Sequence, residues 1–126
     1  MKSFSILLFI LSFALTGFAQ DYAALTNALK CGNVSALTDQ FTDKIDLTIL
    51  DFDDNCTKDK AASQLAAFFS KYRATKFELV HKGNSPDGKA KYGIGNLTAG
   101  EQTFRINVFF KEADGKFQIS SLKIEK

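Results

Sequence analysis

The single histidine, His81, is the first residue whose chemistry could serve a reaction. It alternates with Phe77 and Leu79, so the three side chains share one face of a predicted strand. Imidazole titrates near neutrality and can act as an acid, a base or a hydrogen-bond donor. The competing interpretation is a core-edge histidine satisfied by one hydrogen bond. In the regular part of the three longest predicted strands, no acid shares the inward face except Glu112, beside a turn. We therefore predict no catalytic residues and lean against an enzyme.

Cys31 and Cys56 are the only cysteines. In an oxidising compartment they could form a disulfide that ties the loop after the first helix to the start of the third. The alternative is two unpaired, small apolar side chains, and the sequence leaves both open. Two cysteines without further histidines make a poor zinc site, so we predict no metal and no cofactor.

The elements that would position these residues begin with residues 76–125, which read as four antiparallel strands joined by three hairpins. Asp114-Gly115 is a typical two-residue hairpin turn. The apolar residues before this turn occupy even positions, but Phe117 and Ile119 are odd whereas Leu122 and Ile124 are even. Because side chains alternate between faces, one extra residue is needed to keep this set on one side. We therefore predict a β-bulge at Ser120-Ser121.

The predicted registers give the sheet a hollow inner face. If Leu97 pairs with Phe104, Gly93 and Gly95 lie on that face; the alternative register, with Ile94 opposite Ile106, stays open. Two positions without side chains beside a bulge indicate a curved sheet with room on its concave side. The candidate ligand-binding residues of this pocket are His81, Tyr72, Tyr22, Gly93 and Gly95.

The upstream half reads as helices that cover the sheet. We predict helices at residues 21–29 and after Asn33, a short strand at residues 44–50, an acidic turn at residues 50–55, and a long helix capped by Thr57. The apolar stripe of the long helix should pack on the concave sheet face. The expected fold class is therefore α+β: two short helices, a short strand, and a long helix packed on a curved four-stranded antiparallel meander.

Residues 1–19 have the features of a signal peptide. Lys2 precedes an apolar run from Ile6 to Leu15, and Gly17-Phe18-Ala19 is a small-x-small cleavage site. Cleavage after Ala19 would leave a single domain at residues 20–126, exported to the periplasm or secreted, without a membrane span. Its formal charge would fall from +2 to +1, because the leader contains Lys2 and no acid. Charges so nearly balanced and so scattered argue against a nucleic-acid surface.

The opposite, convex face of the sheet is a candidate interface. The predicted registers bring Val80, Tyr92, Ile94 and Phe109 together there, with polar residues around them. An apolar patch with a polar rim is typical of an interaction surface, and we prefer a homodimer. The alternative is scattered surface hydrophobic residues without a partner.

The element order resembles the nuclear-transport-factor-two-like cone, which belongs to the cystatin-like folds. Segments of the whole mature chain resemble more closely a domain-of-unknown-function family (4783) of short exported bacterial proteins. These are Leu29-Lys30-Cys31-Gly32-Asn33, Asp46-Leu47-Thr48-Ile49, Phe68-Phe69-Ser70-Lys71, Tyr92-Gly93-Ile94-Gly95-Asn96-Leu97-Thr98 and Leu122-Lys123-Ile124-Glu125-Lys126. The resemblance implies the fold and a bacterial source; related folds often dimerise through this side of the sheet. It brings no established catalytic residues.

These patterns favour an exported, non-catalytic module that binds a small apolar ligand or a partner. The alternative is a small isomerase or hydrolase that uses a cone pocket with His81. A cystatin-like inhibitor is a third hypothesis, but the glutamine-valine-glycine motif of that family is missing.

Overall fold

The computed structural model describes residues 21–126. The predicted leader and its cleavage site after Ala19 lie outside these residues. The helices are residues 21–31, α2 (Val34–Thr38) and α3 (Lys58–Lys71). The strands are β1 (Phe41–Ile49), β2 (Phe52–Thr57), β3 (Ala74–Asn84), β4 (Ala90–Ala99), β5 (Gln102–Ala113) and β6 (Lys116–Glu125).

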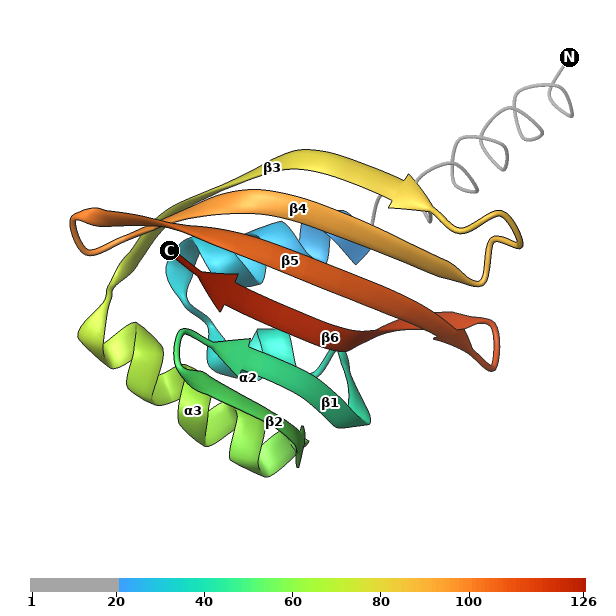
Figure 1. The fold of residues 1–126 in the computed structure, drawn as a ribbon, viewed down its shortest axis with the longest axis horizontal. Helices are drawn as coiled ribbons and strands as arrows, with labels where there is room; N and C mark the ends of the chain where they lie inside the picture. Colours follow the sequence, from blue (N-terminus) through green and yellow to red (C-terminus); the bar gives the residue numbers. More distant parts are fainter. Residues whose placement is uncertain (1–20) are drawn as a thin grey trace, which may run out of the picture.

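The strands form one sheet of six in the order β2-β1-β6-β5-β4-β3 (Figure 1). Neighbouring strands are antiparallel except β1 and β6, which run parallel. The α+β class and the four-stranded meander β3–β6 are confirmed. The strand expected at residues 44–50 is β1, which begins three residues earlier and joins the meander beside β6.

The predicted irregularity in the last strand is also present. Phe109 lies opposite Ser121 and Phe110 opposite Ile119, so Ser120 is the extra residue of a bulge. The bulge keeps Ile119 and Leu122 on the same buried face. The register of β4 on β5 is the predicted one, with Gly95 opposite Ile106.

The acidic turn predicted at residues 50–55 is wrong beyond its first two residues. The chain reverses at Leu50, whose φ is 55°, and returns as β2, which pairs with β1 from Phe52 to Thr57. Three of the six residues in β2 are Asp or Asn, which are depleted in strands. Since β2 is an edge strand, its polar side chains remain in water.

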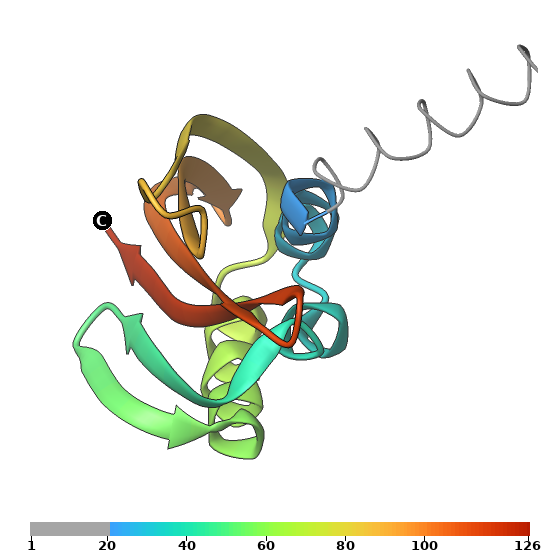
Figure 2. The ribbon, with the colours of Figure 1, turned by 90° about the vertical axis from the view of Figure 1, so that its right-hand side faces the viewer.

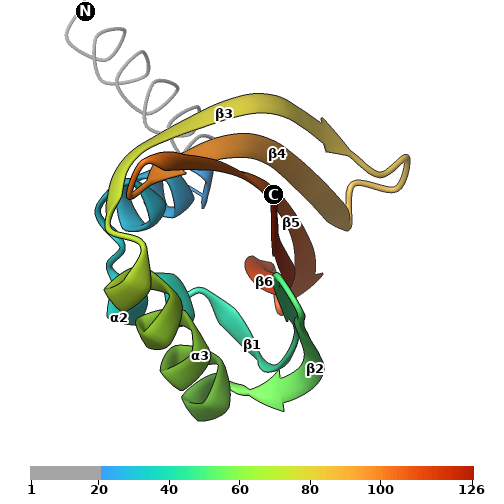
Figure 3. The same cartoon turned by 60° about the vertical axis from the view of Figure 1, so that its left-hand side comes forward.

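The sheet curves around the helices, which lie on its concave side (Figures 2 and 3). The long helix α3 contacts β1, β2 and α2 and also reaches β5, where the Phe68 and Phe104 rings lie 5.1 Å apart. The N-terminal helix covers another part: Tyr22 donates a hydrogen bond to the carbonyl of Tyr92 on β4, at 2.8 Å. The concave face is thus covered by helices from the upstream half, as expected, and both the N-terminal helix and α3 take part.

Candidate functional site

The hollow predicted over the two strand glycines is filled. A Cβ placed on Gly95 would lie 2.5 Å from the Phe77 ring and 2.5 Å from the Glu78 carbonyl oxygen. A Cβ on Gly93 would lie 3.1 Å from a Leu79 methyl group and 3.2 Å from the Tyr22 ring. The absent side chains therefore make room for neighbouring residues and leave no space for a ligand.

His81 does not lie on the inner face, so the predicted pocket position is wrong. Leu79 pairs with Gly95 but His81 pairs with Ile94, so Val80 is an extra residue in β3. This second bulge turns the imidazole to the exposed outer side, where its Nε2 lies 3.1 Å from the Tyr92 hydroxyl. The cone chemistry proposed for His81 therefore has no geometric basis.

The two tyrosines considered for the pocket are packing residues. Tyr72 lies against Phe68 and Phe104, with ring centroids 5.2 and 5.0 Å away. The Tyr22 ring lies edge-on to Phe110 at 5.5 Å. Burial, aided by nearby Asp21, raises the pKa of the Tyr22 hydroxyl above its ordinary value, so it remains a hydrogen-bond donor at neutral pH. Of the five pocket candidates, Tyr22 and Gly93 thus lie together on the inner face, and Gly95 lies on the same face against Phe77.

The sequence reasoning missed Lys91, the one charged residue of the described chain that is buried. Its ammonium group lies 2.7 Å from the Asp21 carboxylate and 4.3 Å from the centre of the Phe117 ring. Tyr22 and Phe110 contribute two further rings at 5.0 and 5.3 Å. Lys91 has the inward parity of Gly93, and this parity was the signal available in the sequence. The ion pair between Lys91 on β4 and Asp21 on the N-terminal helix holds this helix on the sheet.

Cys31 and Cys56 are free thiols in the structure, so the disulfide alternative is not formed. Cys31 is exposed near the end of the N-terminal helix, and its sulfur lies 3.3 Å from the Asn27 carbonyl oxygen. Cys56 is buried opposite Ile45 in the hairpin of β1 and β2. Burial raises the pKa of the Cys56 thiol, which keeps this group protonated and unreactive.

Within residues 21–126, no three His, Cys, Asp or Glu side chains gather as metal ligands. In the same part of the chain, no helix has the length and apolar character needed to cross a membrane.

The four interface candidates do lie together on the outer face. Val80 and Phe109 are 62% and 51% exposed, the greatest exposure of any large hydrophobic side chains in the described chain. Between them lie Ile94, which pairs with His81, and Tyr92, whose ring centre is 6.2 Å from that of Phe109. These four residues define the outer patch, which runs across β3, β4 and β5.

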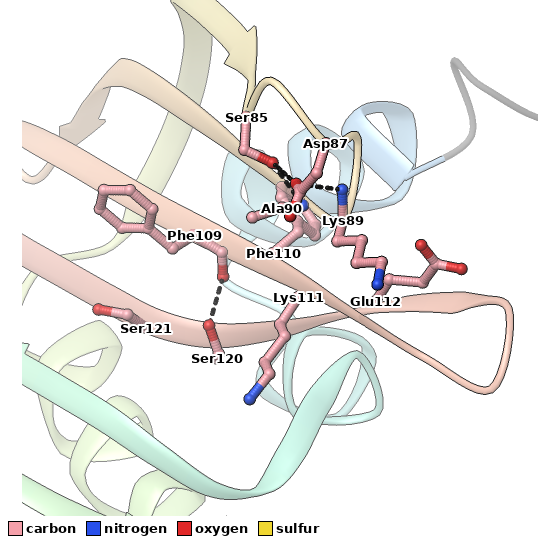
Figure 4. Close-up of a pocket in the computed structure, with 10 residues that line it drawn as sticks. All are labelled: Ser85, Asp87, Lys89, Ala90, Phe109, Phe110, Lys111, Glu112, Ser120 and Ser121. Atoms are coloured by element: carbon pink, nitrogen blue, oxygen red, sulfur yellow. Dashed lines mark hydrogen bonds between the residues drawn. The ribbon is translucent and has the colours of Figure 1, made fainter.

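The outer face is hollowed at both ends of this patch. A hollow of about 520 Å³, here called the hairpin hollow, lies between the β3–β4 hairpin and the bulged part of β5 and β6 (Figure 4). A second hollow, of about 340 Å³, is bounded by Val80, Ile94, Arg105 and Lys126, among others. The concave side of the sheet is closed by its helices, whereas this side offers both apolar area and concavity.

Comparison with known proteins agrees with this architecture. A family model described as Domain of unknown function (DUF4783) matches residues 22–125. The chain belongs to this family. A DUF4783 family protein from Bacteroides uniformis has 31% sequence identity and a TM-score of 0.76, over 82% of this chain and 94% of that one. No curated protein matches the sequence.

More distant structures share only the fold with this DUF4783 chain. A protein called Rd1NTF2_05 has 18% identity and a TM-score of 0.64, over 86% of this chain and 97% of that one. A protein described as a candidate polyketide cyclase, from Sinorhizobium meliloti, has 13% identity and a TM-score of 0.61, over 81% and 90% of the two chains. The fold is therefore nuclear-transport-factor-two-like, as the sequence indicated, and the family's function is not established.

Proposed function

We propose that this protein is an exported, non-catalytic recognition module whose binding surface is the outer face of the sheet. The observation that carries the proposal is the outer patch itself. Val80 and Phe109 remain exposed on the same side of one sheet, although the inner side buries nearly every large apolar residue it carries. Contiguous exposed apolar area with a polar border is a feature of interaction sites.

The enzyme alternative lacks a site in this geometry. The space above Gly93 and Gly95 is occupied by Tyr22, Phe77 and Leu79, and His81 lies on the other face. General acid–base catalysis needs a group within hydrogen-bond reach of a bound substrate. On the outer face His81 is paired with Tyr92, at 3.1 Å. A recognition role therefore accounts for more of the observed arrangement than an isomerase or hydrolase does.

The first partner that we propose for this surface is a second copy of the chain. The border of the patch contains both signs of charge, with Glu78 and Glu125 beside Arg105 and Lys123 on the outward register positions. A twofold interface brings the same surface of two subunits together, so it requires such a self-complementary border. We expect the dimer to bury the half of the patch around Val80 and Ile94, and to leave the hairpin hollow open.

The test is the oligomeric state of the protein purified after export from cells that express the full chain. Multi-angle light scattering should give the mass of a dimer at high micromolar concentration. Because Val80 is 62% exposed, Val80→Lys should leave the fold intact but place two ammonium groups in the interface. We expect this change to weaken dimerisation at least tenfold, or about 1.4 kcal/mol.

A matched control introduces the same charge elsewhere. Ala66 is exposed on α3, away from the outer patch, so Ala66→Lys should leave the dimer mass unchanged. A wild-type protein that stays monomeric at all accessible concentrations, or a Val80→Lys dimer as stable as the wild type, would refute self-association through this face.

A further inference from the structure

We propose that the hairpin hollow is a binding site for a neutral saccharide. The inference deepens the proposed function, on which it rests in one respect: the outer face must be an open recognition surface. It concerns the end of that face away from Val80, and Phe109 is the one residue that it shares with the outer patch. The volume of about 520 Å³ lies within the range of small-molecule sites.

The bulge in β6 builds one wall of the hollow. Because Ser120 is an extra residue opposite Phe109 and Phe110, Ser120 and Ser121 both line the outer side. Ser120 donates a hydrogen bond to the Phe109 carbonyl oxygen at 3.3 Å, which orients the first hydroxyl (Figure 4). Two adjacent hydroxyl groups on a strand therefore border the hollow. A regular strand would have turned one of them inward.

The Phe109 ring provides an apolar platform beside these hydroxyls (Figure 4). Half of this side chain is exposed, and Tyr92 supports it from β4 with ring centres 6.2 Å apart. An aromatic ring has a negatively polarised face, which attracts positively polarised C–H groups. A ligand that stacks here must therefore present such a face.

The charges around the hollow are balanced. Lys89 and Lys111 contribute two cations, and Asp87 and Glu112 contribute two anions. Asp87 is held in the hairpin turn, where it accepts hydrogen bonds from the Ser85 hydroxyl at 2.6 Å and the Lys89 amide at 3.0 Å. Among the described residues, Lys111 forms no ion pair, so its ammonium group is available to a ligand.

These features together select a class of ligand. A phosphorylated or sulfated molecule would require cations that converge on it, and here each cation has an anion in the same rim. A purely apolar molecule would cover the charged and hydroxyl groups without pairing them. A saccharide ring presents C–H groups on one face and hydroxyls around its edge. It would stack on Phe109 while its hydroxyls bond to Ser121 and Lys111.

The experiment is a nuclear magnetic resonance titration of the exported protein, labelled with nitrogen-15. The probes are neutral oligosaccharides built from glucose, galactose, mannose and N-acetylglucosamine, each added to about 20 mM, since a shallow open site should bind in the millimolar range. At least one probe should shift the amide signals of residues 109–112 and 118–121 in a saturable way. No saturable shift with any probe would overturn the proposal.

Variants separate stacking from general surface effects. Phe109→Ala should weaken binding at least tenfold, whereas Phe109→Trp should keep it, because indole offers a larger ring face. Ala66→Lys, on α3 and away from the outer face, should leave the affinity unchanged. Equal affinity in wild type and Phe109→Ala would overturn the proposal, as would tighter binding of glucose 1-phosphate than of neutral glucose oligosaccharides.

The titration and the dimer test can refute the two proposals independently of each other. A monomeric protein that still binds a saccharide at residues 109–121 would refute self-association and support the site. A dimer that is disrupted by Val80→Lys, but shows no saccharide shifts, would support the dimer and overturn the site. Shifts centred on Val80 and Ile94 would also overturn it, because they would place the ligand outside the hairpin hollow.

Discussion

Replacing Asp21 by asparagine should destabilise the protein more than replacing Lys91 by methionine, although both changes remove the same ion pair. The reason is that the two partners are unequally buried. The Lys91 side chain is 6% exposed and that of Asp21 is 33% exposed. The partner that is left behind therefore faces very different surroundings in the two variants.

The size of the loss in unfolding free energy depends on the partner that remains in each variant. Asp21→Asn leaves a buried ammonium group without its carboxylate, a loss of about 3–5 kcal/mol for a fully buried pair. The Phe117, Tyr22 and Phe110 rings still face that ammonium group and offset about 1–2 kcal/mol, so we expect a net loss of about 1–4 kcal/mol, with its centre at about 2.5 kcal/mol. Lys91→Met leaves a carboxylate that water can reach, and the thioether packs between the same rings. Its cost should be about 1 kcal/mol or less.

Urea denaturation of the two variants and of the double variant measures the difference. With a slope of about 2 kcal/mol per molar urea, the two midpoints should differ by about 1 M. The double variant should be close to Lys91→Met alone, because the asparagine no longer faces an ammonium group. A loss for Lys91→Met that equals or exceeds that for Asp21→Asn would refute the reasoning from unequal burial.

Three other predictions concern the strand glycines and the thiols. Gly95→Ala should lower the free energy of unfolding by about 2–3 kcal/mol in urea denaturation, because its Cβ would lie 2.5 Å from a strand carbonyl; Gly93→Ala, which meets movable side chains, should cost less, and the reverse order would contradict this. Without reductant, iodoacetamide should label Cys31 in the native protein and Cys56 only in urea, as read by peptide mass; two unreactive thiols that become reactive on reduction would demonstrate a disulfide instead. Burial raises the pKa of the Cys56 thiol in the folded state. The contribution of Cys56 to the free energy of unfolding should therefore be fully present below the pKa of the unfolded thiol. It should fall as the pH rises from that pKa to the higher pKa of the folded state, as measured by urea denaturation at several pH values.

The part of the fold that could be predicted from sequence is the part in which apolar residues mark one buried face of each strand. The change of parity between Ile119 and Leu122 required one extra residue, and the structure has it at Ser120. The pairing of Phe104 with Leu97 was the preferred of two registers, and the structure has it. In both cases the apolar residues of one buried face indicated the register. A slip by one residue would turn all of these side chains to the solvent.

Strand β2 could not be found in the same way, because a strand at the edge of a sheet does not need an apolar pattern. Its stability comes from the backbone ladder with β1 and from single contacts such as the buried Cys56. Its two aspartates also take part in side-chain hydrogen bonds: Asp53 accepts one from Thr48, and Asp54 accepts one from Lys60. The sequence shows these polar groups but not their partners, which are brought together only by the hairpin.

The same limit explains why the face of the sheet was predicted wrongly for His81 but correctly for Val80, Tyr92, Ile94 and Phe109. On β4 and β5 the buried neighbours fix the direction of each side chain, so Tyr92, Ile94 and Phe109 had to point outward. Beyond Leu79, β3 is an exposed edge whose residues have no buried pattern, and a bulge there costs little. The bulge at Val80 carries His81 from the predicted pocket to the outer face, where it bonds to Tyr92. One unpaired residue thus moves the only imidazole from the closed side of the sheet to the side on which we place recognition.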